Sequence, residues 1–196
     1  SSKISAKREV IAEKAIFIAK KRYIMKIWDS EGVRFKEPHL KMMGIDLVRS
    51  STPAFSKKYL KDSIEIILES TESDILKFIN SVRDKFLKEP LSQIAKVSSI
   101  NNLNYEKGSK GIPINSRAAM VSNEYIAKNC ANRFAPLQVG EKVKMLYLKK
   151  RNPLGENIFA FVDENFANLF KDYIDYDLNF EKFFLKPLEI MTGPLK

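Results

Sequence analysis

The sequence predicts an α+β fold, in which an antiparallel meander of strands is followed by a mainly helical part with a small β subdomain. Residues 8–28 contain short, loosely alternating apolar stretches, VIAEKAIFIA and YIMKIW, which are typical of strands, and the antiparallel meander is predicted over residues 8–48. From residue 52 onward the apolar residues recur at helical spacing. The stretch GEKVKMLYLKKRNPLGENIFAFV then returns to a strand pattern. Strands and helices are therefore segregated along the chain, which indicates the α+β class.

The strand-rich part is expected to lead into a helix. Asp29–Gly32 (DSEG) is a favourable turn between two strands, with Gly32 available for positive φ. Thr52 is placed to be a helix N-cap, and Pro53 to occupy the first helical position, where its missing N–H costs nothing. The helix is expected to bury one stripe of side chains, Phe55, Tyr59, Leu60, Ser63, Ile64 and Ile67.

A second helix is expected next, capped near Thr71 or Ser73 and ended by Pro90. Because the connection ESTES is short, the two helices should pack antiparallel. The buried face of the second helix would carry Ile75, Ile79, Val82 and Phe86.

The rest of the chain alternates between loops, strands and helices. Residues 97–115 are rich in Ser, Asn and Gly and predict a loop, and residues 116–128 predict a helix. NPLG is the expected turn between the two later strands. Residues 165–185 predict a further helix, with Phe166, Leu169, Phe170 and Tyr173 in register.

Composition excludes several classes of protein. With 44% hydrophobic and 30% charged residues, the 196-residue chain is expected to be soluble and globular. A single cysteine, Cys130, rules out an internal disulfide framework, and with one histidine, His39, it cannot form a zinc site built mainly from His and Cys. No apolar run approaches a membrane span, so no membrane partner is expected.

The formal net charge of +10 is concentrated in two blocks. Residues 1–61 hold 15 Lys and Arg against 6 Asp and Glu, and residues 103–151 hold 10 against 3. Residues 62–102 and 152–196 are net acidic. This segregation favours a polyanion that is contacted by two separate segments, and a merely soluble basic protein is the alternative.

The motif KKRY, at residues 20–23, is the first candidate contact with such a polyanion. Lys and Arg supply charge and donors to phosphate, while Tyr adds a flat apolar face and a hydroxyl. On a strand, Lys21 and Tyr23 share one face, and Lys20 and Arg22 share the other. A solvated strand end is the structural alternative.

The loop at residues 97–111 is the second candidate. Its GSKG stretch is flanked by lysines, and its glycines let backbone N–H groups approach an anion closely. The spacing of a phosphate-binding P-loop is absent, and a polar surface loop is the alternative. The candidate residues here are Ser98, Ser99, Asn101, Asn102, Lys107 and Lys110.

The stretch YIDYD, at residues 173–177, resembles paired aspartates that hold metal ions. Asp175 and Asp177 lie between two amphipathic segments, which favours helix N-caps over a metal site. A small metal-dependent nuclease that uses Asp172, Asp175 and Asp177 is kept as an alternative function.

Taken in order, five stretches resemble the C-terminal third of the family B DNA polymerases, and most of all those of the T-even-type phages. The resemblance covers nearly the whole chain, and the order of the motifs is more specific than any one of them. The stretches are KREVIAEKAIFIAKKRYIMKIWDSEG, LKMMGIDLVRSSTP, VSSINN, GEKVKMLYLKKRNPLG and FFLKPLE.

This resemblance implies that residues 1–48 are the C-terminal edge of the palm domain and residues 49–196 the thumb, which holds the primer–template duplex. In the family, the Lys and Tyr of KKRY touch the primer strand near its growing end. That role is implied for Lys21 and Tyr23, with Lys20 and Arg22 beside them. The remaining implied DNA contacts are Arg49, Ser50 and Ser51, and then Ser98, Ser99, Asn101, Asn102, Lys107, Lys110 and Arg117.

The resemblance also implies what this chain does not contain. The metal-binding aspartates, the dNTP-binding helix and the exonuclease of the family belong to sequence upstream of KKRY. We therefore expect no catalytic residue, metal ligand or cofactor in this chain, and Mg²⁺ only in the complete polymerase.

The expected partners are primer–template duplex DNA and the remainder of the polymerase. That remainder would be joined in cis if the chain is an excised piece, or would be a separate chain if the polymerase gene is split. The implied location is the cytoplasm of an infected host cell. A free-standing nucleic-acid-binding protein that shares ancestry with the polymerases is the competing hypothesis.

Overall fold

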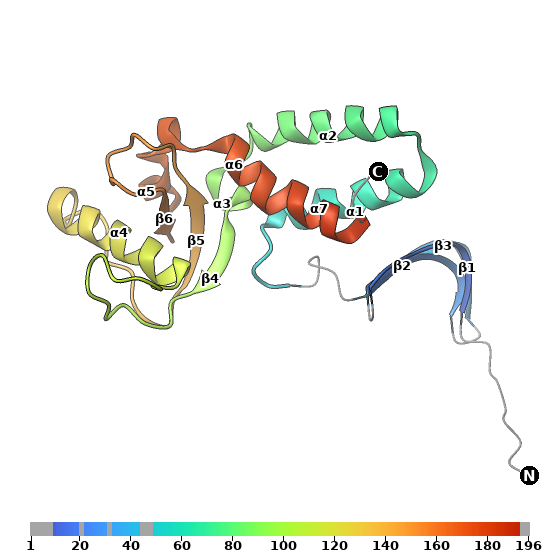
Figure 1. Ribbon diagram of the computed structural model, residues 1–196, viewed down its shortest axis with the longest axis horizontal. Coiled ribbons are helices and arrows are strands. Elements are labelled where there is room, and N and C mark those ends of the chain that lie inside the picture. Colours follow the sequence, from blue (N-terminus) through green and yellow to red (C-terminus); the bar gives the residue numbers. More distant parts are fainter. Residues whose placement is uncertain (1–9, 20–21, 31–32, 44–48, 193–196) are drawn as a thin grey trace, which may run out of the picture.

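The computed structural model describes residues 10–19, 22–30, 33–43 and 49–192. Two separate three-stranded antiparallel sheets and a set of helices confirm the α+β class. The molecule is elongated, with the first sheet at one end, the second sheet with α4 and α5 at the other, and α1, α2, α6 and α7 between them (Figure 1). None of the helices in these ranges has the length and apolar character needed to cross a bilayer.

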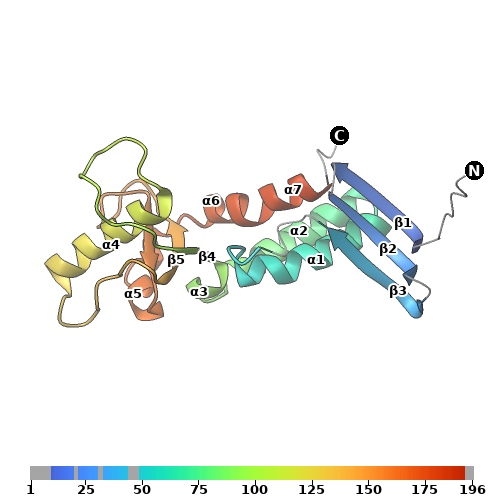
Figure 2. The same cartoon turned by 90° about the horizontal axis from the view of Figure 1, so that it is seen from below.

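The first sheet is the predicted meander, in the order β1-β2-β3. It consists of β1 (Val10–Ala19), β2 (Arg22–Ser30) and β3 (Val33–Met43). The pairs Asp29↔Arg34 and Ser30↔Val33 lie at the predicted DSEG turn, whose Glu31 and Gly32 are outside the described residues. The end of α7 lies beside β1, at the edge of this sheet (Figure 2).

The two predicted helices form an antiparallel pair, α1 (Ala54–Glu69) and α2 (Glu72–Phe86) (Figure 1). Thr52 is not the N-cap of α1, because Pro53 itself has extended dihedral angles, φ −54° and ψ 144°, and the helix begins at Ala54. Ser51 lies in the turn before the helix and is held beside the second sheet, because its carbonyl accepts a hydrogen bond from Val97 N–H at 3.0 Å. The expected stripe is confirmed, with Phe55, Tyr59, Leu60, Ser63 and Ile64 buried and Ile67 packed at its margin.

The cap and the end of α2 differ in detail from the prediction. Thr71 is at the N-cap position, but its hydroxyl donates to the Asp74 carboxylate at 2.7 Å and caps no backbone N–H. The helix ends at Phe86, and Pro90 instead precedes a short helix, α3 (Leu91–Ile94). Of the predicted face, Ile75, Val82 and Phe86 are buried and Ile79 is partly buried.

The second sheet has the order β4-β5-β6, with β4 (Lys96–Ser99), β5 (Lys142–Tyr147) and β6 (Ile158–Phe161). The loop prediction for residues 97–115 is wrong over its first residues, because KVSS pairs with β5 and polar side chains do not prevent strand pairing at a sheet edge. The predicted helix is confirmed as α4 (Ile114–Asn129), and it packs on the sheet. The NPLG turn is also confirmed, with Gly155 at φ 70°.

The predicted helix over residues 165–185 is broken. The chain instead forms α5 (Glu164–Asn168), a 3₁₀ turn η2 (Lys171–Tyr173), α6 (Tyr176–Phe180), a π-helical segment η3 (Glu181–Leu185) and α7 (Lys186–Thr192). Phe166 and Phe170 are buried as predicted, whereas Leu169 and Tyr173 are exposed.

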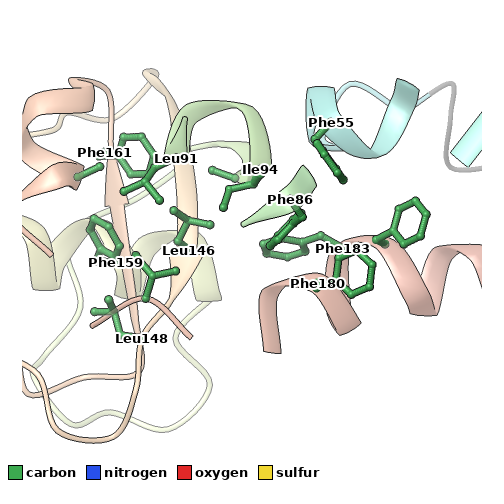
Figure 3. Packing of buried hydrophobic residues seen from close by; sticks show 14 of the residues in the cluster. Phe55, Phe86, Leu91, Ile94, Leu146, Leu148, Phe159, Phe161, Phe180 and Phe183 are labelled. Atoms are coloured by element: carbon green, nitrogen blue, oxygen red, sulfur yellow. The ribbon is translucent and has the colours of Figure 1, made fainter. Parts of the chain in front are cut away.

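One hydrophobic cluster joins the helices to the second sheet. Figure 3 shows Phe86 between Phe55 and Phe180, and its ring centroid is 5.2 Å from each of theirs. The same cluster continues to Leu146 and Phe159 in the sheet. The helices and the second sheet therefore pack as one unit, which fixes the position of the site described next.

Candidate nucleic-acid interface

Two adjoining hollows lie where α1, β4 and the helical run α6–η3–α7 meet. Their volumes are about 100 Å³ and about 250 Å³, and both are lined by Lys96, Lys182 and Phe183. Arg49 lines the smaller hollow and Lys186 the larger. We call this feature the cationic groove and define it by Arg49, Lys96, Lys182 and Lys186.

Backbone pairing brings the first two cations together. The hydrogen bond between Ser51 and Val97 holds the segment that precedes α1 against β4. Arg49 is two residues before this contact, and Lys96 is the first residue of β4, paired with Met145 of β5. Two segments nearly fifty residues apart in sequence therefore present their cations to one hollow.

The other two cations come from the C-terminal helical run. The ammonium nitrogen of Lys182 is 5.3 Å from the centroid of the Tyr147 ring, a cation–π contact. The Phe183 ring is 5.9 Å from the same ring. Lys186 begins α7, and its ammonium nitrogen is 3.7 Å from the Glu181 carboxylate, with both side chains about half exposed. The floor of the larger hollow is thus aromatic and its rim is cationic.

Tyr147 lies under these charges. Burial raises the pKa of its hydroxyl, and the positive charge of Arg117 acts in the opposite direction. Arg117, a predicted DNA contact, lines neither hollow. Its guanidinium is also 3.7 Å from the Glu156 carboxylate.

The predicted contacts are only partly brought together. Arg49 and Ser51 line the smaller hollow, and Ser50 is exposed between them. Side chains alternate between the two faces of a strand, so Lys96 and Ser98, which are two residues apart in β4, lie on the same face. Ser99 accepts a hydrogen bond from the Asn115 side chain at its carbonyl, 2.6 Å away.

The rest of the predicted loop contacts do not line either hollow. Asn101 is exposed, and the Asn102 side chain accepts a hydrogen bond from the N–H of Asn104 at 2.9 Å. Lys107 forms an ion pair with Glu124 of α4 at 2.8 Å. Lys110 is exposed next to Gly111, which has φ 84°, while Gly108 has φ 86°.

The KKRY motif is described only in part. Lys20 and Lys21 are outside the described residues. The backbone of Arg22 and Tyr23 begins β2, where Tyr23 pairs with Phe17 and Met43. The roles implied for these four side chains are therefore still predictions.

Three groove residues were missed by the sequence analysis, Lys96, Lys182 and Lys186. Lys96 lies in the net acidic block 62–102, and the other two lie in the acidic block 152–196. The net charge of a whole block does not reveal an individual lysine within it. The spacing of four residues between Lys182 and Lys186 was the available signal, since it places both on one helical face.

The carboxylates of the YIDYD stretch act structurally. The Asp175 side chain accepts a hydrogen bond from Leu178 N–H at 3.0 Å, which confirms it as an N-cap. Asp177 is in the first turn of α6 and forms an ion pair with Arg83 of α2. Within residues 10–19, 22–30, 33–43 and 49–192, no three His, Cys, Asp or Glu side chains are grouped so that they could hold a metal ion.

Comparisons with known proteins agree with this architecture. The family model for DNA polymerase family B matches residues 1–192. The DNA-directed DNA polymerase of Escherichia phage RB69 is 36% identical over 187 residues, which cover 90% of this chain and 20% of that protein. The corresponding enzyme of Enterobacteria phage T4 is 31% identical over 179 residues, which cover 87% of this chain and 20% of the enzyme. The chain thus spans about a fifth of the length of these relatives.

A solved structure has the same fold. The family B DNA polymerase from the hyperthermophilic archaeon Pyrobaculum calidifontis matches with a TM-score of 0.58 and 16% identity, over 94% of this chain and 22% of that one. The fold, the family match over nearly all of the chain and the two phage relatives lead to one conclusion. The chain belongs to DNA polymerase family B.

Proposed function

We propose that this chain is the thumb, with an edge of the palm, of a DNA-directed DNA polymerase, and that it holds primer–template duplex DNA during synthesis. Residues 1–48 would be the palm edge and residues 49–196 the thumb. The observation that carries the proposal is the convergence of Arg49, Lys96, Lys182 and Lys186, from three separate segments, on one groove.

The chemistry of the groove suits a phosphate backbone. Lysine and arginine neutralise phosphates whatever the base sequence, and such contacts fix the register of a duplex without reading it. A polymerase must hold every sequence alike, so backbone contacts fit this task better than base readout. Lys21 and Tyr23 of the KKRY motif would add contacts to the primer strand.

Holding the duplex would contribute to catalysis by positioning. A primer terminus kept in line with the incoming nucleotide reacts as part of an organised complex, which lowers the entropic cost of the reaction. The catalytic aspartates and their Mg²⁺ would belong to the remainder of the polymerase, in cis or on a separate chain. We therefore expect this chain alone to bind duplex DNA and to incorporate no nucleotide.

The direct test is duplex binding by the 196-residue chain, measured by fluorescence anisotropy across a range of salt concentrations. Lys96→Ala and Lys182→Ala should each weaken binding and reduce the salt slope by about 1, as expected for loss of one phosphate contact. Lys77→Ala is the matched control, because Lys77 is an exposed cation on α2 that lines neither hollow. If all three substitutions weakened duplex binding equally, the loss would reflect the net charge of the chain and not the groove, and the proposal would be contradicted.

A further inference from the structure

The amide side chain of Asn179 is completely buried beneath the cationic groove, and each of its polar atoms has a hydrogen-bond partner. Its Oδ1 accepts from Tyr147 N–H at 2.9 Å. Its Nδ2 donates to Tyr147 C=O at 2.9 Å and to Asp175 C=O at 2.8 Å. A single side chain thus binds both backbone groups of the tyrosine that forms the floor of the groove.

The end of β4 explains why Tyr147 requires such a partner. Pairing of β4 with β5 stops at Lys96↔Met145, and Tyr147 is two residues farther along β5. In an antiparallel ladder, residues two apart direct their N–H and C=O to the same side. Where β4 is missing, the N–H of Tyr147 has only Asn179 as its partner, and a buried unpaired group would be costly, whereas the C=O of Tyr147 also accepts from Asp175 N–H at 3.1 Å.

The segment leading into α6 takes the place of β4. Lys149 N–H donates to Tyr173 C=O at 2.8 Å, and Leu148 forms an isolated bridge with Ile174. Asp175 N–H donates to Tyr147 C=O at 3.1 Å, and the Asn179 side chain adds the hydrogen bond to Tyr147 N–H. Backbone hydrogen bonds and one side chain together attach the helical run α6–η3–α7 to the edge of the second sheet.

This attachment has a consequence for the groove. Lys182 follows Asn179 by three residues, so the two lie within one turn of the same helical run. The Lys182 ammonium is over the Tyr147 ring, whose backbone Asn179 binds. Movement of Tyr147 away from α6 would change the distance between Lys182 on the helical run and Lys96 on β4.

We propose that Asn179 is a positioning residue, which sets the spacing of Lys182 and Lys96 across the cationic groove through its hydrogen bonds to Tyr147. The identity of the ligand as duplex DNA rests on the proposed function, whereas the positioning rests on the contacts themselves.

The test compares Asn179→Ala with Asn123→Ala in the 196-residue chain. Asn123 is a matched control, because its side chain also binds both backbone groups of one residue: it accepts from Leu137 N–H at 2.7 Å and donates to Leu137 C=O at 2.8 Å. It lines neither hollow of the groove. Both variants should lose thermal stability, and binding is measured well below both melting temperatures.

We expect Asn179→Ala to weaken duplex binding by about tenfold and to lower the salt slope by about 1, while Asn123→Ala stays within about twofold of the unsubstituted chain. Amide hydrogen exchange at Tyr147 should accelerate in Asn179→Ala alone. In a Lys182→Ala background, Asn179→Ala should have little further effect on binding, because the cation that it positions is gone.

Unchanged binding in Asn179→Ala, or equal losses in both asparagine variants, would overturn the proposal. If Asn179→Ala does not fold, Asn179→Leu serves in its place, since it fills a similar volume and removes the hydrogen bonds to Tyr147 without adding a charge. A different result would contradict the proposed function itself, namely unchanged duplex binding in both Lys96→Ala and Lys182→Ala.

Discussion

Single side chains replace missing backbone partners at several places in this molecule. Ser122 of α4 is fully buried, and its hydroxyl binds both groups of Ala160 in the edge strand β6, donating to C=O at 2.6 Å and accepting from N–H at 3.0 Å. The Ser122 hydroxyl thus pairs backbone groups of β6 at the edge of the sheet where no further strand follows. Such contacts are specific to the tertiary structure, and the sequence around Ser122 shows only an ordinary helical serine.

Ser122→Ala should destabilise the chain by about 1–3 kcal/mol, because two backbone groups at a buried edge lose their partner. Chemical denaturation measures the change. Ser81→Ala is the control, since the Ser81 hydroxyl donates to Phe78 C=O on the exposed surface of α2 and its loss should stay within about 0.5 kcal/mol. A cost for Ser122→Ala no greater than that of the control would contradict this role.

Glu124 illustrates the electrostatics of the surface. Hydrogen bonds from the Lys107 ammonium and then from the Lys128 ammonium lower the pKa of Glu124 from 4.5 to about 2. Because the pKa is depressed in the folded chain, the interaction contributes to stability above pH 4.5, and the contribution fades as the pH falls toward 2. A carbon-detected NMR titration should therefore place Glu124 well below the ordinary glutamate range, and Lys107→Ala should raise its pKa. A midpoint near 4.5 in the unsubstituted chain would refute the ion pairs.

At the scale of elements, helical periodicity predicted α1 and α2 well, because each buries a continuous stripe. The C-terminal run was predicted less well, since its breaks depend on contacts with other elements. Pro187 lacks the N–H that Phe183 C=O would accept in a regular α-helix. A π-helical segment takes the place of the regular α-helix here, and in it Lys186 N–H donates to Glu181 C=O. The buried hydroxyl of Ser56, on α1, donates to Phe183 C=O at 2.7 Å.

Ser56→Ala should therefore destabilise the chain by about 1–3 kcal/mol, because it leaves a buried carbonyl unpaired. In a Pro187→Ala background the cost should be smaller, since the restored N–H at residue 187 can serve the same carbonyl. A double-mutant cycle in denaturant measures the coupling. Additive costs would show that the serine and the proline act independently.

At the scale of the whole molecule, the order of motifs and the two basic blocks indicated a polymerase part that contacts a polyanion. Membership of DNA polymerase family B is confirmed. The groove also contains Lys96, Lys182 and Lys186, which lie in the two net acidic blocks of the sequence. The spacing of Lys182 and Lys186 in sequence indicates a shared helical face, but it does not show that Lys96 and Tyr147 lie beside Lys182, because the folded sheet supplies these partners. Lys107, a predicted phosphate contact, forms an exposed ion pair with Glu124 in the fold, and its role toward phosphate stays a prediction.

A primer-extension assay tests whether nucleotide transfer requires the remainder of the polymerase. The 196-residue chain, supplied with Mg²⁺, dNTPs and primed template, should extend no primer, because the catalytic aspartates of the family would be on the remainder of the polymerase. Denaturing gel electrophoresis of the labelled primer reports the result. Extension by the purified chain would require a nucleotidyl-transfer site within it and would disprove the assignment.

NMR mapping of backbone amides during titration with a short duplex tests whether the phosphate backbone of DNA lies along the cationic groove. The largest shifts are expected at residues 49–52, 96–99 and 182–186, saturating together and reversed by added salt. Shifts confined to the loop at residues 105–111, or to the separate pocket lined by Arg133 and Asp163, would contradict this placement of the DNA.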